Sequence, residues 1–297
     1  MENEKKTEKL IVKIGTEAMG ADKGPPDLAI LGPIVDQMAT LKKQGHRILH
    51  VASGAVGIGR ALVSKMPSDL QDYLDCCDPI VAKQIFASYG QHILMGTYQQ
   101  LLQPHNMLAA QALVSQHNLS SPRNHSYHTT ARAVTTAKAA PHTLPIINEN
   151  DTTEVTELMY TDNDGVAGLL ACITYADRLI VISTSGGVYD RNPDQPGARL
   201  LSTIDANKWP KINTDGKSGS GTGGMKSKLD VIKKWVAPNG IITHIIGPKD
   251  SIMDVLEGKS VGTTILPKHQ DSAVPARSAG ANGRRTILPV RLGVLQI

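Results

Sequence analysis

The chain has 297 residues, 40% of them hydrophobic and 20% charged, which is ordinary for a globular enzyme and excludes an intrinsically disordered chain. Its net charge of +4 is concentrated at one end, because residues 268–297 hold five Lys or Arg and one Asp. Aromatic residues make up only 3%. A basic tail without aromatic stacking platforms does not predict a nucleic-acid-binding groove, so we expect no nucleic-acid partner.

The N-terminal residues MENEKKTEKL are charged and lead directly into a strand-like segment. They contain no apolar stretch typical of a secretory signal, and no apolar run approaches the roughly 18 residues of a transmembrane helix. The three cysteines show neither a disulfide pattern nor metal-ligand spacing. These features predict a cytoplasmic protein without a membrane partner and without a protein-held metal.

Short β-branched segments alternate with longer amphipathic patterns along the chain. This order predicts an α/β fold with a mostly parallel sheet covered by helices on both faces, and ligands at the carboxyl ends of the strands. The expected strands are 10–14, 48–52, 108–114, 144–147, 179–182 and 241–246, and the expected helices are 27–44, 80–102, 124–139, 163–176, 225–236 and 251–257.

Other segments lack regular patterns. We expect loops at 53–59 and 185–223 and an interruption of the helix 80–102 near Gly90. The segment after Gly262 is interpreted as an added strand or a loosely held tail.

A glycine-rich segment, GSGTGGMKSKL at 219–229, leads into a helical pattern. Glycines let backbone N–H groups approach an anion, and Lys228 on the first helical turn is placed to reach a phosphate oxygen. A flexible surface loop is the alternative. The segment matches G-x-G-x-x-G without the strand and acidic residue of a dinucleotide site, and Lys211 stands where a P-loop requires glycine.

Lys13 lies inside the apolar segment LIVKIGT. A lysine there is either on an edge strand facing water or directed at a ligand beyond Gly15, because an unpaired buried ammonium is costly.

Polar residues follow two other expected strands. Ser53, Gly54 and Ala55 follow the second strand. The segment NEND (148–151) follows the fourth, and TDND (161–164) comes ten residues later, just before an expected helix. Asx carboxylates accept hydrogen bonds from an amino group, and Asn amides donate to a carboxylate, so these residues suit an amino acid ligand. Helix capping by Asp162, Asn163 and Asp164 is the alternative.

Eight segments, in one collinear order, are similar to the amino acid kinase family, and within it to the members that phosphorylate glutamate. They are VKIGT (12–16), VASGAVGIGR (51–60), YGQHILMGTY (89–98), PIINENDT (145–152), TDNDGVAGLLA (161–171), GGVYDRNP (186–193), GSGTGGMKSKL (219–229) and LEGKSVGTT (256–264).

The resemblance implies a three-layer αβα sandwich around a mostly parallel sheet. It also implies transfer of the ATP γ-phosphoryl group to the side-chain carboxylate of L-glutamate, giving γ-glutamyl phosphate in the first step of proline biosynthesis. ATP with Mg²⁺ is the implied cofactor, and the Mg²⁺ would bridge phosphate oxygens. A homo-oligomer, dimer or tetramer, and feedback inhibition by proline are further expectations.

By the same resemblance Lys13 and Lys228 would stabilise the transferring group, and Asp164 would hold both lysines. The residues implied in substrate binding are Ser53, Gly54, Ala55, Asn148, Asp151, Asp162 and Asn163. The residues implied in nucleotide binding are Lys13, Gly15, Ser183, Thr184, Thr222, Gly223, Gly224, Met225, Lys226, Ser227 and Lys228.

The chain departs from the family pattern in several places. Ser183-Thr184 stands where relatives carry Thr-Asp, and Glu17 replaces a small hydroxyl residue. Ser183-Thr184 and Glu17 keep open a nucleotide- or glutamate-binding protein without turnover. The segment 115–132 matches the family only loosely, which keeps open a kinase for another acid, such as N-acetylglutamate or aspartate. We expect a kinase domain over 1–266 and a basic tail, an added strand or disordered, over 267–297, too short for the PUA-type domain of many relatives.

Overall fold

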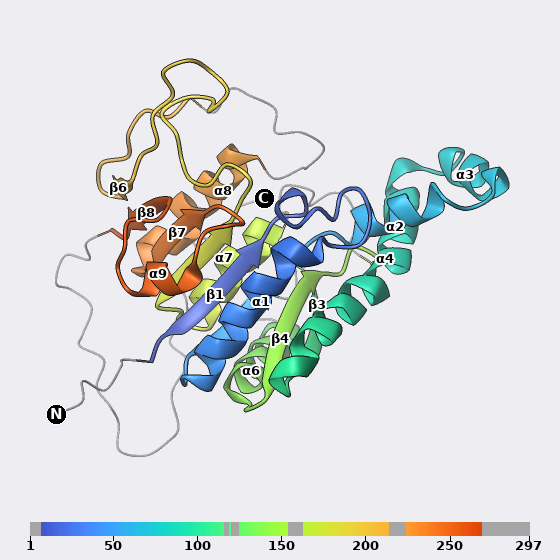
Figure 1. Cartoon of the computed structure of the whole chain (residues 1–297), viewed down its shortest axis with the longest axis horizontal. Helices are drawn as coiled ribbons and strands as arrows, with labels where there is room; N and C mark the ends of the chain where they lie inside the picture. Colours follow the sequence, from blue (N-terminus) through green and yellow to red (C-terminus); the bar gives the residue numbers. More distant parts are fainter. Residues whose placement is uncertain (1–6, 116–118, 120–124, 154–162, 214–223, 269–297) are drawn as a thin grey trace.

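The computed structural model describes residues 7–115, 119, 125–153, 163–213 and 224–268. Its strands form one sheet in the order β3-β4-β2-β1-β5-β7-β8-β6 (Figure 1). The strand bounds are β1 Lys9–Ile14, β2 Arg47–Val51, β3 Leu108–Val114, β4 Thr143–Glu149, β5 Arg178–Ile182, β6 Thr203–Asp205, β7 Ile242–Ile246 and β8 Thr263–Leu266.

The centre of the sheet is parallel, as predicted. β1 lies between β2 and β5, with Lys13 opposite Val51 on one side and Val181 on the other. β4 and β7 extend the parallel arrangement outward, and β8 then runs antiparallel to β7. The carboxyl ends of β1, β2, β4, β5 and β7 therefore meet at one edge, here called the carboxyl edge.

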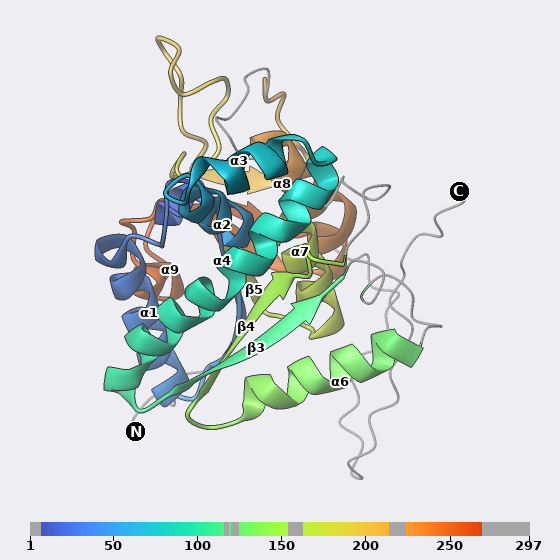
Figure 2. The same ribbon diagram turned by 90° about the vertical axis from the view of Figure 1, so that its right-hand side faces the viewer.

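Helices cover both faces of the sheet, which confirms the three-layer arrangement. α1 (Leu28–Lys43), α2 (Ala55–Val63), α4 (Pro79–Leu102) and α9 (Ile252–Leu256) cover one face. α6 (His125–Ala139), α7 (Asn163–Ile173), α8 (Met225–Val231) and the π-helical turn η4 (Ile232–Val236) cover the other. In Figure 2, β3 and β4 run between α4 and α6.

Alternation along β1 assigns its side chains to these two faces. Leu10, Val12 and Ile14 pack with the α1 and α4 side, whereas Ile11 packs with the α7 side. Successive strand residues point to opposite faces, so Lys13 shares the face of Ile11. The side chain of Lys13 is therefore directed toward α7 and α8.

Two expectations about the α4 side are wrong. Residues 53–59 are not a loop, because α2 begins at Ala55, and α4 continues through Gly90 without interruption. Gly90 is a packing residue: a Cβ there would collide with the backbone oxygen of Ala55. The missing side chain lets α4 lie directly against the first turn of α2.

Shorter elements complete the fold. α3 (Ser68–Asp75) and β6 lie in segments for which no element was expected, and α3 projects beyond the sheet (Figure 1). β8 follows Gly262 directly, where an added strand was one of the two interpretations. The 3₁₀ turns are η1 (Glu17–Met19), η2 (Gln103–His105) and η5 (Ala237–Asn239). No helix in the described part of the chain is long and apolar enough to cross a membrane.

Lys138, near the end of α6, is a buried lysine with an unusual ionisation. Its residue is 3% exposed, and burial together with the nearby charge of Lys9 lowers its pKa to about 7 from an ordinary value of 10.5. The unfolded chain therefore binds a proton that the folded chain does not, over the interval from pH 7 to 10.5. Linkage makes the folded state gain stability as pH rises through that interval.

We expect Lys138→Met to raise the free energy of unfolding at pH 7 by about 2 to 4 kcal/mol, from about 1.36 kcal/mol per pKa unit. The gain should shrink to below about 1 kcal/mol at pH 10, where the unfolded lysine also starts to lose its proton. Urea unfolding at both pH values measures the difference. The matched change at the exposed Lys65, Lys65→Met, should give no such pH-dependent gain. An equal gain from Lys138→Met at pH 7 and pH 10 would contradict the lowered pKa.

Candidate active site

Three charged side chains from distant parts of the chain meet beneath the carboxyl edge. The Nζ of Lys13 lies 2.7 Å from Oδ1 of Asp164, and the Nζ of Lys228 lies 2.9 Å from Oδ2 of the same carboxylate. All three residues are buried, with exposures of 3%, 4% and 6% for Lys13, Asp164 and Lys228. This group, called the charged trio below, holds two ammonium groups with one carboxylate.

Each member of the trio is placed by the fold. Lys13 is the next-to-last residue of β1, and Asp164 lies in the first turn of α7. Lys228 lies on α8, which follows the extended residue Gly224. Because Lys13 lies on a central strand and is buried, the edge-strand alternative is wrong.

The ionisation of Asp164 is set by opposing effects. Burial raises the pKa of a carboxyl group, but the charges and hydrogen bonds of Lys13 and Lys228 outweigh it, so the pKa of Asp164 lies below its ordinary value. The carboxylate is therefore ionised at neutral pH, and the trio carries one net positive charge.

The turn after β2 contributes Ser53, Gly54 and Ala55 to the same edge. Ser53 is buried, and Gly54 adopts a left-handed conformation with φ of 106°. A side chain at Gly54 would also approach Ala21 within 2.8 Å. Glycine is thus required there for the chain to turn from the strand into α2.

Amide side chains gather at the end of β4. Asn148 is buried, and its Oδ1 accepts a hydrogen bond from the Glu149 N–H at 3.0 Å. Asn163 Oδ1, from α7, accepts from the same N–H at 3.0 Å. The structure therefore brings Asn148 and Asn163 together from two segments.

Asp151 lies in the turn after β4. Burial raises its pKa, although Lys83, whose Nζ lies 3.6 Å from Oδ1, acts in the opposite direction. Lys83 comes from α4 and was not among the expected site residues; nothing in its helical surroundings distinguishes it in the sequence.

The residues expected to bind nucleotide also lie along this edge. Gly15 follows β1, and its N–H donates to Ile182 O at 3.2 Å, next to Ser183 and the exposed Thr184 after β5. Gly224 precedes α8, on which Met225 and Ser227 are partly buried and Lys226 is exposed. Glu17 is partly exposed in η1. Asp162, Thr222 and Gly223 lie outside the described residues.

The match to known proteins agrees with this geometry. Residues 8–247 match the model of the amino acid kinase family. The chain belongs to the amino acid kinase family.

Relatives of this amino acid kinase share a common name. The chain is 33% identical over 264 residues to glutamate 5-kinase from Bacteroides thetaiotaomicron, covering 87% of this chain and 70% of that protein. It is 32% identical over 268 residues to glutamate 5-kinase from Pelobacter propionicus, covering 89% and 69%.

Solved structures with low sequence identity share the fold of this amino acid kinase. The carbamate kinase from Giardia lamblia bound to AMP-PNP superposes with a TM-score of 0.61 at 14% identity, covering 89% of this chain and all of that one. The UMP kinase from Bacillus anthracis gives a TM-score of 0.57 at 12% identity, covering 88% and 97%. These likenesses support the fold and say nothing of the substrate.

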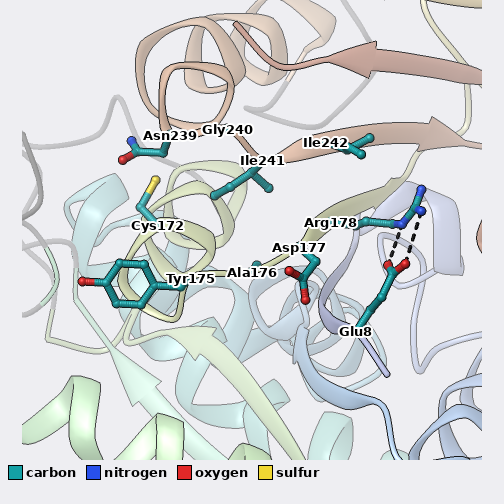
Figure 3. A pocket seen from close by; sticks show the side chains of 10 residues that line it. All are labelled: Glu8, Cys172, Tyr175, Ala176, Asp177, Arg178, Asn239, Gly240, Ile241 and Ile242. Carbon is teal, nitrogen blue, oxygen red and sulfur yellow. Dashed lines mark hydrogen bonds and ion pairs between the residues drawn. The ribbon is translucent and has the colours of Figure 1, made fainter. Parts of the chain in front are cut away.

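A hollow of about 320 Å³ lies at the opposite edge of the sheet from the trio (Figure 3). Its charged groups are satisfied by one another: Arg178 Nε lies 2.6 Å from Glu8 Oε2, and Asp177 Oδ2 accepts from the Lys9 N–H at 2.7 Å. Burial raises the pKa of the Cys172 thiol in its wall to about 12, so this thiol is not a nucleophile at neutral pH. The hollow therefore has no reactive group suited to phosphoryl transfer.

Proposed function

We propose that this chain catalyses ATP-dependent phosphorylation of the L-glutamate side-chain carboxylate, giving γ-glutamyl phosphate and ADP. The observation that carries the proposal is the charged trio, in which two buried ammonium groups converge at the carboxyl edge. The relatives named glutamate 5-kinase support glutamate as the acid substrate.

The trio fits phosphoryl transfer. An oxygen of the substrate carboxylate would attack the γ-phosphorus, a new P–O bond would form, and the bond to the ADP oxygen would break. Charge spreads over the equatorial oxygens during such a transfer, so positioned cations supply most of the catalysis. Lys13 and Lys228 would provide this charge from two sides, and Asp164 would keep both ammonium groups in place. A carboxylate with a pKa near 4.3 is already ionised, so the reaction needs no general base.

The amino acid and ATP would bind at different parts of the carboxyl edge. We propose that Ser53, Asn148, Asp151 and Asn163 hold the amino acid, and that Asp162 joins them. Gly15, the pair Ser183-Thr184 and the segment 222–228 would hold ATP, with backbone N–H groups and Lys228 facing its phosphates.

Mg²⁺ would enter with the nucleotide. No group of three or more His, Cys, Asp or Glu side chains gathers as a metal site in residues that the structure describes. Mg²⁺ bound with a nucleotide commonly stays on phosphate oxygens and water. The ion would neutralise phosphate charge there, while the protein supplies the lysines.

Several wider properties follow from the same likeness. We propose that the reaction is the first step of proline biosynthesis and that proline is a feedback inhibitor. We also propose that the protein is a cytoplasmic homo-oligomer. The kinase domain would span residues 1–266, with 267–297 as an appended basic tail.

The test is ATP turnover with a panel of acids, trapping any acyl phosphate with hydroxylamine as the hydroxamate. We expect hydroxamate from L-glutamate and at least about 100-fold less from aspartate or N-acetylglutamate, because a site built for a given polar substrate leaves its groups unpaired with an analogue. More hydroxamate from another acid than from L-glutamate would show that the other acid is the substrate. Binding of ATP and glutamate without hydroxamate would show a binding protein.

A further inference from the structure

Gln91, on α4, carries a buried amide nitrogen without a partner. Its Oε1 accepts a hydrogen bond from Asn148 Nδ2 at 2.8 Å. Its Nε2 is buried and has no hydrogen-bond partner in the part of the chain that the structure describes. A buried N–H group left without an acceptor costs free energy, so it needs an acceptor beyond the described residues, such as water or a ligand.

Neighbouring hydrogen bonds determine which atom of the Gln91 amide is the oxygen and which is the nitrogen. The Glu149 N–H donates to Asn148, which identifies the accepting atom as Asn148 Oδ1. Asn148 therefore presents its Nδ2 donor to Gln91, and only the Gln91 oxygen can accept it. Turning the Gln91 amide over would set two N–H₂ groups against each other. The unsatisfied atom is thus a donor.

The packing of α4 places this donor at the substrate end of the site. Gly90, the residue before Gln91, lies directly against the backbone of Ala55 at the start of α2. Asn148 approaches Gln91 from the end of β4. Gln91 is therefore joined through Asn148 to one segment assigned to the amino acid, and the residue before it packs against another.

We propose that Gln91 determines substrate specificity by donating a hydrogen bond from Nε2 to the α-carboxylate of the amino acid substrate. The inference rests on the proposed function and deepens it. The side-chain carboxylate of glutamate must reach the trio to react, so the α-carboxylate is the substrate's remaining anionic acceptor. Asn148 fixes the orientation of the Gln91 amide.

The decisive variant is Gln91→Glu, which has nearly the same shape and still offers Asn148 an oxygen acceptor. It replaces the donor with a negative charge, so glutamate binding should weaken by about 10- to 100-fold, as for loss of a hydrogen bond to a charged group. L-isoglutamine, which has an amide in place of the α-carboxylate, can donate to the new carboxylate. Its dissociation constant should change by less than about 3-fold, well below the loss for glutamate.

Titration calorimetry with L-glutamate and L-isoglutamine measures the ratio of dissociation constants without turnover, and kinetics give KM for ATP. Gln100→Glu is the matched control, because it adds the same charge to an exposed position of the same helix. Of the two variants that add a charge, we expect only Gln91→Glu to change the ratio of dissociation constants. KM for ATP should stay unchanged in both. Gln91→Met, which adds no charge, should weaken glutamate binding about 10-fold.

Glutamate binding unchanged within about 2-fold in both Gln91 variants, or equal weakening of both ligands, would overturn the role of Gln91 while leaving the kinase assignment intact. Failure of the unaltered protein to make hydroxamate from glutamate would instead overturn the proposed function, and the inference with it. Circular dichroism and thermal unfolding establish that each variant is folded.

Discussion

Lys228→Ala is expected to lower ATP-dependent hydroxamate formation by at least about 100- to 1000-fold, the scale of losing one charge-stabilising donor in a transition state. The fold should survive, because the change leaves Lys13 and Asp164 as a neutral ion pair at 2.7 Å. Initial rates with saturating glutamate and ATP give the effect on turnover, and circular dichroism with thermal unfolding gives the effect on the fold.

Lys226→Ala is the matched control for that experiment. Lys226 lies on the same helix and is exposed, whereas Lys228 is buried against Asp164. The control should retain turnover within a few-fold. Activity of a folded Lys228→Ala protein within a few-fold of the parent would show that this ammonium group does not act on the transferring phosphoryl group.

Asp164→Asn should have the largest effect on stability. It removes the carboxylate that Lys13 and Lys228 share and leaves two buried ammonium groups without it. Removing one partner from a buried ion pair typically costs about 3 to 5 kcal/mol. We expect a loss of this size in the free energy of unfolding, measured by urea denaturation at pH 7, together with loss of turnover.

Two further variants separate the charge effect from general damage. Asp230→Asn changes an exposed carboxylate on α8 and should cost less than about 0.5 kcal/mol. The double variant Asp164→Asn with Lys228→Met keeps one buried ammonium group in place of two, so it should be more stable than Asp164→Asn alone. Equal stability of the single and double variants would show that repulsion between the lysines is not the cause.

The acid side of the stability curve gives an independent check on Asp164. Its pKa is lowered in the folded protein, so the folded state binds fewer protons than the unfolded state below about pH 4. Its contribution to stability is fully present above the unfolded pKa and is lost as pH falls through the folded value. Asp164→Asn should therefore remove part of the parent's loss of stability below pH 4.

The central fold was predictable because its signals are local. The buried strands of a parallel sheet are short apolar segments, and the amphipathic helices between them repeat every three to four residues. Parallel strands also put their carboxyl ends at one edge, so the polar residues after the expected strand ends at 14, 52 and 147 were expected together. Lys13 was identified by its unusual place within an apolar strand.

Other features depend on contacts between distant segments. The segment 53–59 contains three glycines and was expected to be a loop, yet packing of α4 through Gly90 stabilises the helix that begins at Ala55. β8 pairs with β7 in the reverse direction, and no local pattern indicates that direction. Gln91 lies inside a segment matched to the family, but its unpartnered nitrogen is visible only once Asn148 is placed beside it.

The trio also bears on how the protein is made. Lys13 and Asp164 precede Lys228 in the chain, so the two opposite charges of this pair are synthesised before the second ammonium group. Only then does the second ammonium arrive and leave the buried centre positively charged. The affinity of this centre for anions is therefore completed late in translation, after most of the sheet that surrounds it has been synthesised.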